Sequence, residues 1–181
     1  MSAKYDNTVY EIILELLKNK THIRELSRKI NISHDTVFRK LNQLEKDGFI
    51  DYKKIGRNKV FFLKNNLKTK NLVFMAERYK QLKLYSKYPN LEVIFDDILK
   101  EIKKMAILFG SYAKFKAKKT SDIDIYIETK NKKIQKKIED INSKLSVHIG
   151  KFDKNSPLIK EIIKDHVIIK NIERFYKKVK L

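Results

Sequence analysis

The sequence predicts an α+β protein, and three observations support this fold class. Apolar residues recur every three or four positions over most of the chain, which is the period of amphipathic helices. In the first third of the chain, two short runs rich in aromatic and β-branched residues flank a turn at Gly56, which is typical of a β-hairpin. In the second half, apolar and polar residues alternate from Ile123 to Ile127, which is the period of a strand.

The length of 181 residues allows one large domain or two small ones, at roughly 150 residues per domain. The change from helices and a hairpin to strands mixed with helices favours two. We assign residues 1–66 to a first domain, 67–88 to a linker helix and 89–181 to a second, mixed α/β domain. The linker helix carries a candidate apolar seam formed by Leu72, Met75, Tyr79 and Leu82.

Three helices are expected in the first domain, over residues 8–19, 22–30 and 33–47. Thr8 and Glu11 have the spacing of a capping box at the start of the first helix. Each helix has an apolar stripe at helical spacing, so each is expected to bury one face.

Ser33 is expected to cap the third helix, and Gly48 is expected to end it in the left-handed conformation. Two strands should follow, over residues 50–55 and 59–63, around the turn at Gly56. Two helices, a turn, a third helix and a hairpin form the order of a winged helix-turn-helix.

In that arrangement the third helix lies in the major groove of DNA, and its outward side chains should be polar. Arginine and lysine suit guanine edges and phosphates, whereas glutamine suits adenine. The candidate DNA-contacting residues on the third helix and the hairpin are His34, Thr36, Arg39, Lys40, Gln43, Arg57 and Lys59.

The segment from Ile23 to Ile50 resembles the winged-helix transcriptional regulators of bacteria and archaea. The pattern is carried by Leu26, Ile30, Ser33, Val37, Leu41, Leu44 and Gly48-Phe49-Ile50. The resemblance implies binding to double-stranded DNA, commonly as a homodimer. A winged helix used for protein contact, or a helical bundle with polar faces, is the alternative.

The second domain is expected to alternate helices and strands. The expected helices cover residues 91–102, 131–144 and 171–180, with another starting at Ser156-Pro157, where proline suits the first helical position. The expected strands cover residues 105–109, 123–127, 145–152 and 166–169.

The strongest chemical pattern of the second domain is Gly110-Ser111 at the end of one strand and Asp122/Asp124 at the next. Two aspartates two positions apart on a strand project from one face, roughly 7 Å apart. Their mutual repulsion costs stability unless a cation binds them, and Mg²⁺ prefers oxygen ligands together with nucleotide phosphates. A partly exposed strand with incidental acids is the alternative.

This pattern resembles the polymerase-beta-type nucleotidyltransferases, most closely their minimal archaeal and bacterial members. The resemblance implies Mg²⁺-dependent transfer of a nucleotidyl group from a nucleoside triphosphate. It places the triphosphate at Gly110, Ser111 and Lys114, and makes Asp122 and Asp124 the metal-binding and catalytic residues. The family usually has a third carboxylate on a following strand, and here His148 stands at the expected position.

Composition favours polyanionic partners, since 42 basic residues against 22 acidic ones give a net charge of +20. A lysine-rich solvated surface is the alternative explanation, and it applies equally to the basic loop of Lys114, Lys116, Lys118 and Lys119. The chain has no cysteine, no signal-peptide pattern and no apolar run long enough to span a membrane, so a cytoplasmic location is expected.

Two hypotheses follow for the whole protein. In one, it is an enzyme that a winged helix brings to DNA, with a protein acceptor or a helical toxin as a candidate partner, as in minimal relatives. In the other, it is a transcriptional regulator whose second domain is inactive and only binds a nucleotide or a partner protein. The absence of an acid at position 148 leaves both open.

Overall fold

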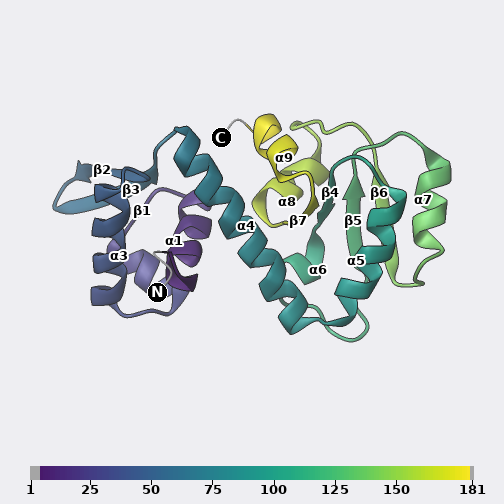
Figure 1. The fold of residues 1–181 in the computed structure, drawn as a ribbon, viewed down its shortest axis with the longest axis horizontal. Helices are drawn as coiled ribbons and strands as arrows, with labels where there is room; N and C mark the ends of the chain where they lie inside the picture. Colours follow the sequence, from purple (N-terminus) through teal and green to yellow (C-terminus); the bar gives the residue numbers. More distant parts are fainter. Residues whose placement is uncertain (1–4, 180–181) are drawn as a thin grey trace. The chain divides into compact units, whose positions relative to one another are not determined.

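The computed structural model describes residues 5–179. Its contacts divide the chain into two compact units, with the boundary between Tyr79 and Lys80. That boundary falls inside α4 (Leu67–Lys87), so a single helix contributes residues to both units (Figure 1). The outer limits expected for the domains, residues 1 and 181, and the expected end of the last helix at residue 180 lie outside the described residues.

The first unit has the predicted order of helices followed by a hairpin. Its elements before α4 are α1 (Asn7–Lys18), β1 (Thr21–His22), α2 (Ile23–Ile30), α3 (His34–Lys46), β2 (Ile50–Ile55) and β3 (Asn58–Leu63). The three strands form an antiparallel sheet in the order β1-β3-β2. The two-residue strand β1, which pairs Thr21 with Phe61, was not predicted because it is too short to show a period.

Local signals at the helix ends were only partly predicted. Ser33 caps α3 as expected, since its hydroxyl accepts a hydrogen bond from the backbone N–H of Thr36, and Gly48 has a φ of +73°. The capping box expected at Thr8 is wrong. Asp6 caps α1 instead, because its carboxylate accepts the backbone N–H of Val9 and so places Thr8 inside the first turn.

The second unit is a mixed α/β structure, as predicted. Its elements after α4 are α5 (Asn90–Glu101), β4 (Ala106–Leu108), α6 (Gly110–Ala113), β5 (Ile123–Ile127), α7 (Lys132–Glu139), β6 (Leu145–Ile149), α8 (Pro157–Lys164), β7 (Val167–Lys170) and α9 (Ile172–Val179). The strand order is β6-β5-β4-β7, with β5 and β6 parallel and the other pairs antiparallel. The helix expected over residues 131–144 ends at Glu139, because a turn leads from there into β6.

Both faces of this sheet are covered. Alternate residues of β5, including Ile123 and Ile125, join a core with Phe95 and Ile98 of α5 and residues of α4 and α7. On the other face, the ring of Tyr126 contacts Phe152, and further aromatic contacts lead to α9. In Figure 1, α7 flanks β6 at one edge of the sheet, whereas α8 and α9 lie toward β7. The alternation therefore leaves Asp124 on the face that carries Tyr126, near the start of β5.

Two residues of the apolar seam expected along the linker helix are not buried within the chain, since Met75 is 49% exposed and Leu82 is 64% exposed. The buried side chains of α4 are instead Leu72, Val73, Ala76 and Leu84, with Thr69, Glu77 and Gln81. A single stripe does not describe this helix because its first part packs in one unit and its last part packs in the other. Among residues 5–179, no helix has the length and apolar character that a membrane span requires.

Candidate functional site

Gly110 and Asp124 lie in direct contact at the start of α6 and β5. Gly110 has a φ of +69°, a conformation that favours glycine. A Cβ atom built on Gly110 would lie 2.3 Å from Oδ2 of Asp124, so no larger residue fits without moving the carboxylate. The backbone N–H of Phe109 donates to the carbonyl of Asp124 at 3.0 Å and holds the two segments together. The absence of a side chain at Gly110 therefore sets the position of this carboxylate.

Asp124 carries an unfavourable negative charge. Burial raises the pKa of its carboxyl group, the negative charges of Asp122 and Glu161 raise it further, and His148 and Ser146 oppose the rise. Asp122 is exposed and precedes β5, while Asp124 is half-buried within it. A cation at this position would relieve the cost of keeping both aspartates ionised.

Glu161 of α8 is an acidic neighbour of the site that the sequence did not reveal. Its Oε1 lies 3.1 Å from Nζ of Lys114, the lysine expected to hold a triphosphate. Nothing local connects Glu161 with Asp124, since they lie on elements far apart in the chain. Folding thus brings a third acid near the aspartate pair and gives Lys114 an acidic partner.

The strand β6 presents no carboxylate beside Asp124. In the parallel register Asp124 lies opposite Ser146, and Tyr126 lies opposite His148. The Nε2 atom of His148 is 3.3 Å from the hydroxyl of Ser146, and its imidazole contacts the ring of Phe109 edge-on. His148 is therefore held by a hydroxyl and an aromatic ring beside the aspartate pair.

The donors at this position fit a hard divalent cation. Asp122 and Asp124 supply carboxylate oxygens, and Mg²⁺ is usually bound by one or two carboxylates together with substrate phosphates. Across residues 5–179, no three or more Asp, Glu or His side chains group closely enough to hold a metal by themselves. The arrangement is thus suited to a metal that arrives with a phosphate ligand.

The candidate DNA-contacting residues of α3 differ in how far they are exposed. His34, with a side chain 51% exposed, and Arg39 lie on the surface, and Arg39 donates to the hydroxyl of Thr36 at 3.4 Å. Gln43 is half-buried on the same helix. Lys40 is not brought to this surface, because its side chain is only 23% exposed and its Nζ lies 2.8 Å from Oδ2 of Asp6.

The hairpin places both of its predicted basic residues on the surface. Arg57 is exposed in the turn between β2 and β3, and Lys59 is exposed at the start of β3. The ammonium group of Lys59 lies 3.9 Å from the centre of the Tyr52 ring. Lys53 and Lys54 are exposed on the neighbouring strand, so the hairpin end is uniformly basic.

Phe38 was not among the candidate DNA-contacting residues. It is 49% exposed on α3, next in sequence to Arg39. An apolar side chain in this place suits contact with a thymine methyl group. The signal was present in the sequence, since Phe38 falls outside the buried stripe of Val37, Leu41 and Leu44.

Two family models match the chain in the regions just described. Residues 94–174 match the family described as polymerase beta, nucleotidyltransferase, and residues 5–51 match winged helix-turn-helix DNA-binding. The protein therefore combines an N-terminal DNA-binding winged helix with a C-terminal nucleotidyltransferase-type domain. The two matches confirm the class of domain that the sequence predicts for each half of the chain.

Among solved structures, a variant of ZitR from Lactococcus lactis is similar to part of the chain. The sequence identity is 20% and the TM-score is 0.40, and the similarity covers 50% of this chain and 62% of that one. No curated protein matches the chain.

Proposed function

We propose that the first unit binds double-stranded DNA and that the second unit binds a nucleoside triphosphate with Mg²⁺ and transfers a nucleotidyl group. The observation that carries the nucleotide part is the contact between Gly110 and the carboxylate of Asp124. It leaves a backbone without a side chain next to a metal-binding carboxylate, so phosphates can approach both at once.

Each residue of the site has a role in this proposal. Asp122 and Asp124 hold the metal, which when bound neutralises the charge of the triphosphate. Ser111 donates its hydroxyl to a phosphate oxygen, and Gly110 permits the close approach. Lys114 exchanges its ion pair with Glu161 for the triphosphate.

Binding and transfer can be tested separately. Calorimetric titration of the protein with a non-hydrolysable triphosphate should show saturable binding with Mg²⁺ and little binding in EDTA. Asp122→Ala with Asp124→Ala should abolish binding, whereas Asp140→Ala, an exposed aspartate at the end of α7, should not. Equal binding by native protein and double variant would contradict the proposal.

A second candidate is nucleotide binding without transfer. It is favoured by the register of β6, which places Ser146 rather than an acid opposite Asp124. Radiolabelled nucleoside triphosphates with Mg²⁺ and DNA or protein acceptors decide between the two. Label on an acceptor that depends on Asp124 supports the enzyme, and binding with no label transferred supports the second candidate.

The pair formed by Lys114 and Glu161 gives a sharper prediction. Glu161→Gln removes a negative charge near the phosphate position and releases Lys114, so triphosphate affinity should rise about three- to tenfold. If Glu161 instead helps to hold the metal, the same variant should bind more weakly. If Glu161 does not hold the metal, Lys114→Gln should lower the affinity for triphosphate.

The DNA part is tested by variants of the exposed basic residues. Arg39→Ala and Arg57→Ala should each weaken binding to a selected duplex by about 1–3 kcal/mol. Lys18→Ala is the control, because Lys18 is exposed at the end of α1 and pairs with Glu15. If the Arg39→Ala/Arg57→Ala double variant binds the duplex with unchanged affinity, the surface that carries these two arginines does not bind DNA.

A further inference from the structure

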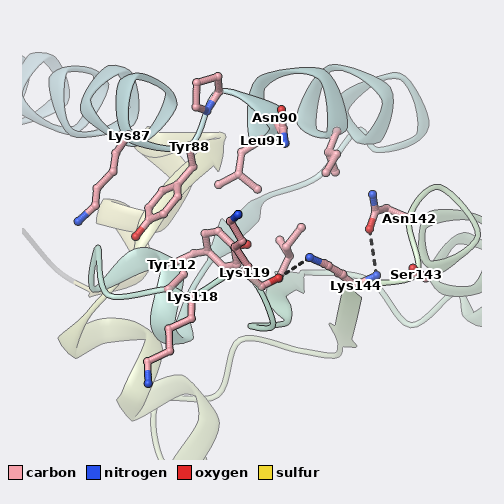
Figure 2. A pocket seen from close by; sticks show the side chains of 14 residues that line it. Lys87, Tyr88, Asn90, Leu91, Tyr112, Lys118, Lys119, Asn142, Ser143 and Lys144 are labelled. Carbon is pink, nitrogen blue, oxygen red and sulfur yellow. Dashed lines mark hydrogen bonds between the residues drawn. The ribbon is translucent and has the colours of Figure 1, made fainter.

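A cavity of about 630 Å³ lies in the second unit beside the elements that carry the aspartate pair. Three connecting segments line it, namely the connection from α4 to α5, the loop after α6 and the turn before β6, together with residues of α5, α6 and β5 (Figure 2). Its size lies within the range of roughly 300–1,000 Å³ that small-molecule sites occupy. Tyr112 and Ile123, which line it, belong to the apolar core face of the sheet, whereas Asp124 is on the other face.

The charge around this cavity is entirely positive. Its described lining includes Lys87, Lys118, Lys119 and Lys144 and no acidic residue. Lys87 and Lys144 are held by backbone carbonyls, those of Phe115 at 2.6 Å and Lys119 at 2.5 Å. The side chains of Lys118 and Lys119 have no ion pair or hydrogen bond within residues 5–179. In Figure 2 the amino groups of Lys87 and Lys118 point outward, away from Leu91 and Tyr112.

The walls are suited to a flat ring. Tyr88 and Tyr112 meet edge to face with centroids 4.9 Å apart, and Leu91 and Ile94 supply the aliphatic part of the lining. The hydroxyl of Tyr88 is buried and has no hydrogen-bond partner among the described residues, which is a costly state. Asn142 and Ser143 add polar groups at one side.

We propose that this cavity is a second ligand site, which takes a small organic phosphate with a planar ring, of the size of a nucleoside monophosphate. The ring lies between the aromatic and aliphatic walls, and the phosphate lies at the rim, where Lys118 and Lys119 bind it. Lysine binds phosphate as a point charge, so these two exposed lysines need no fixed geometry. The site requires no metal, which separates it from the aspartate pair.

Titration of the full-length protein in EDTA tests the proposal, with the four common ribonucleoside monophosphates used one at a time. At least one of the four monophosphates should bind saturably, as measured by calorimetry or ligand-observed NMR. Inorganic phosphate and the corresponding nucleoside should each bind at least about tenfold more weakly, because each supplies half of the contacts. Absence of binding by all four would overturn the proposal.

Two sets of variants locate the binding. Lys118→Glu with Lys119→Glu should weaken the monophosphate at least about tenfold, whereas Lys130→Glu with Lys133→Glu, exposed in the same unit, should not. Asp124→Ala should leave monophosphate binding in EDTA intact, even though it should abolish the Mg²⁺-dependent binding of triphosphate. An equal loss of monophosphate affinity in both pairs of lysine variants would show that the attraction is nonspecific, and it would overturn the proposal.

Discussion

At the scale of single residues, Asp124 carries a cost in stability at the position where we propose that a metal binds. Burial and two acidic neighbours raise the pKa of its carboxyl group, so the ionised form is disfavoured in the folded protein. The glycine at position 110 leaves the space that this carboxylate occupies, because a Cβ atom there would lie 2.3 Å from Oδ2 of Asp124. Such a cost is typical of a site that binds a cation.

Asp124→Asn should therefore stabilise the protein when no metal is present. Because the folded-state pKa is raised, the ionised carboxylate opposes folding at neutral pH, and this penalty disappears as the pH falls and the native side chain is protonated. In EDTA at pH 7 the variant should melt about 1–2 °C higher than the native protein. Any further stabilisation of the native protein by Mg²⁺ with triphosphate should be absent in the variant, and Asp140→Asn should show neither effect.

Glu128 shows the opposite behaviour. Burial disfavours its charge, but Arg174 and Lys178 outweigh burial and hold the pKa of its carboxyl group below the ordinary value. A lowered folded-state pKa means that the charged pair stabilises the fold above the unfolded-state pKa and that this stability is lost in acid. Glu128→Gln should cost about 1–2 kcal/mol in urea unfolding at pH 7. The difference from the native protein should shrink as the pH is lowered through 4, and a constant difference would contradict this account.

At the scale of elements, the start of α1 is linked to α3, the helix that carries most of the candidate DNA-contacting residues. Asp6 caps α1 through Val9 and pairs with Lys40 of α3, and hydrogen bonding to Lys40 is the main cause that lowers the pKa of Asp6. Asp6 thus caps the start of α1 and holds the ammonium group of Lys40 on α3 in an ion pair. The orientation of Lys40 depends on this contact.

Two substitutions at Asp6 separate its roles. Asp6→Ala removes the cap and should lower the free energy of unfolding by about 1 kcal/mol. Asp6→Asn keeps a capping oxygen and should cost less than half of that. Both release Lys40, so the affinity for duplex DNA should rise slightly in each, as measured by fluorescence anisotropy; a fall in affinity in Asp6→Asn would contradict the assigned role of the pair.

At the scale of the whole molecule, the net charge of +20 favours long-range attraction to polyanions. The basic residues are not confined to one tail. Exposed arginines and lysines lie on α3 and the hairpin, while a separate group surrounds the cavity of the second unit. The charge therefore supports two kinds of anionic ligand rather than one.

DNA binding should accordingly depend strongly on salt. Each phosphate contact contributes roughly 0.9 to the slope of log K against log salt concentration on duplex DNA. Arg57→Ala should reduce this slope by about 1, because Arg57 is exposed in the hairpin turn. Lys133→Ala in the second unit should leave the slope unchanged, and an equal reduction by both variants would indicate attraction by net charge alone.

Much of the fold could be predicted because it depends on neighbours in the chain. The strand β2, the cap at Ser33, the left-handed Gly48 and the proline at the start of α8 all follow from local hydrogen bonding and backbone sterics. Two of the failures have a different cause. The burial of α4 is divided between two units, and β1 exists only through its pairing with β3.

The candidate site divides in the same way. The sequence by itself predicted the two domain classes and assigned Gly110 and Asp124 to one candidate site, because a glycine at a strand end and alternating aspartates are local features. Their direct contact depends on the pairing of β4 with β5. Tertiary structure alone decided that Glu161 pairs with Lys114, that Lys40 pairs with Asp6, and that lysines from separate loops surround one cavity. These contacts join residues far apart in the chain, and their positions depend on how helices and strands pack rather than on any period that the sequence displays.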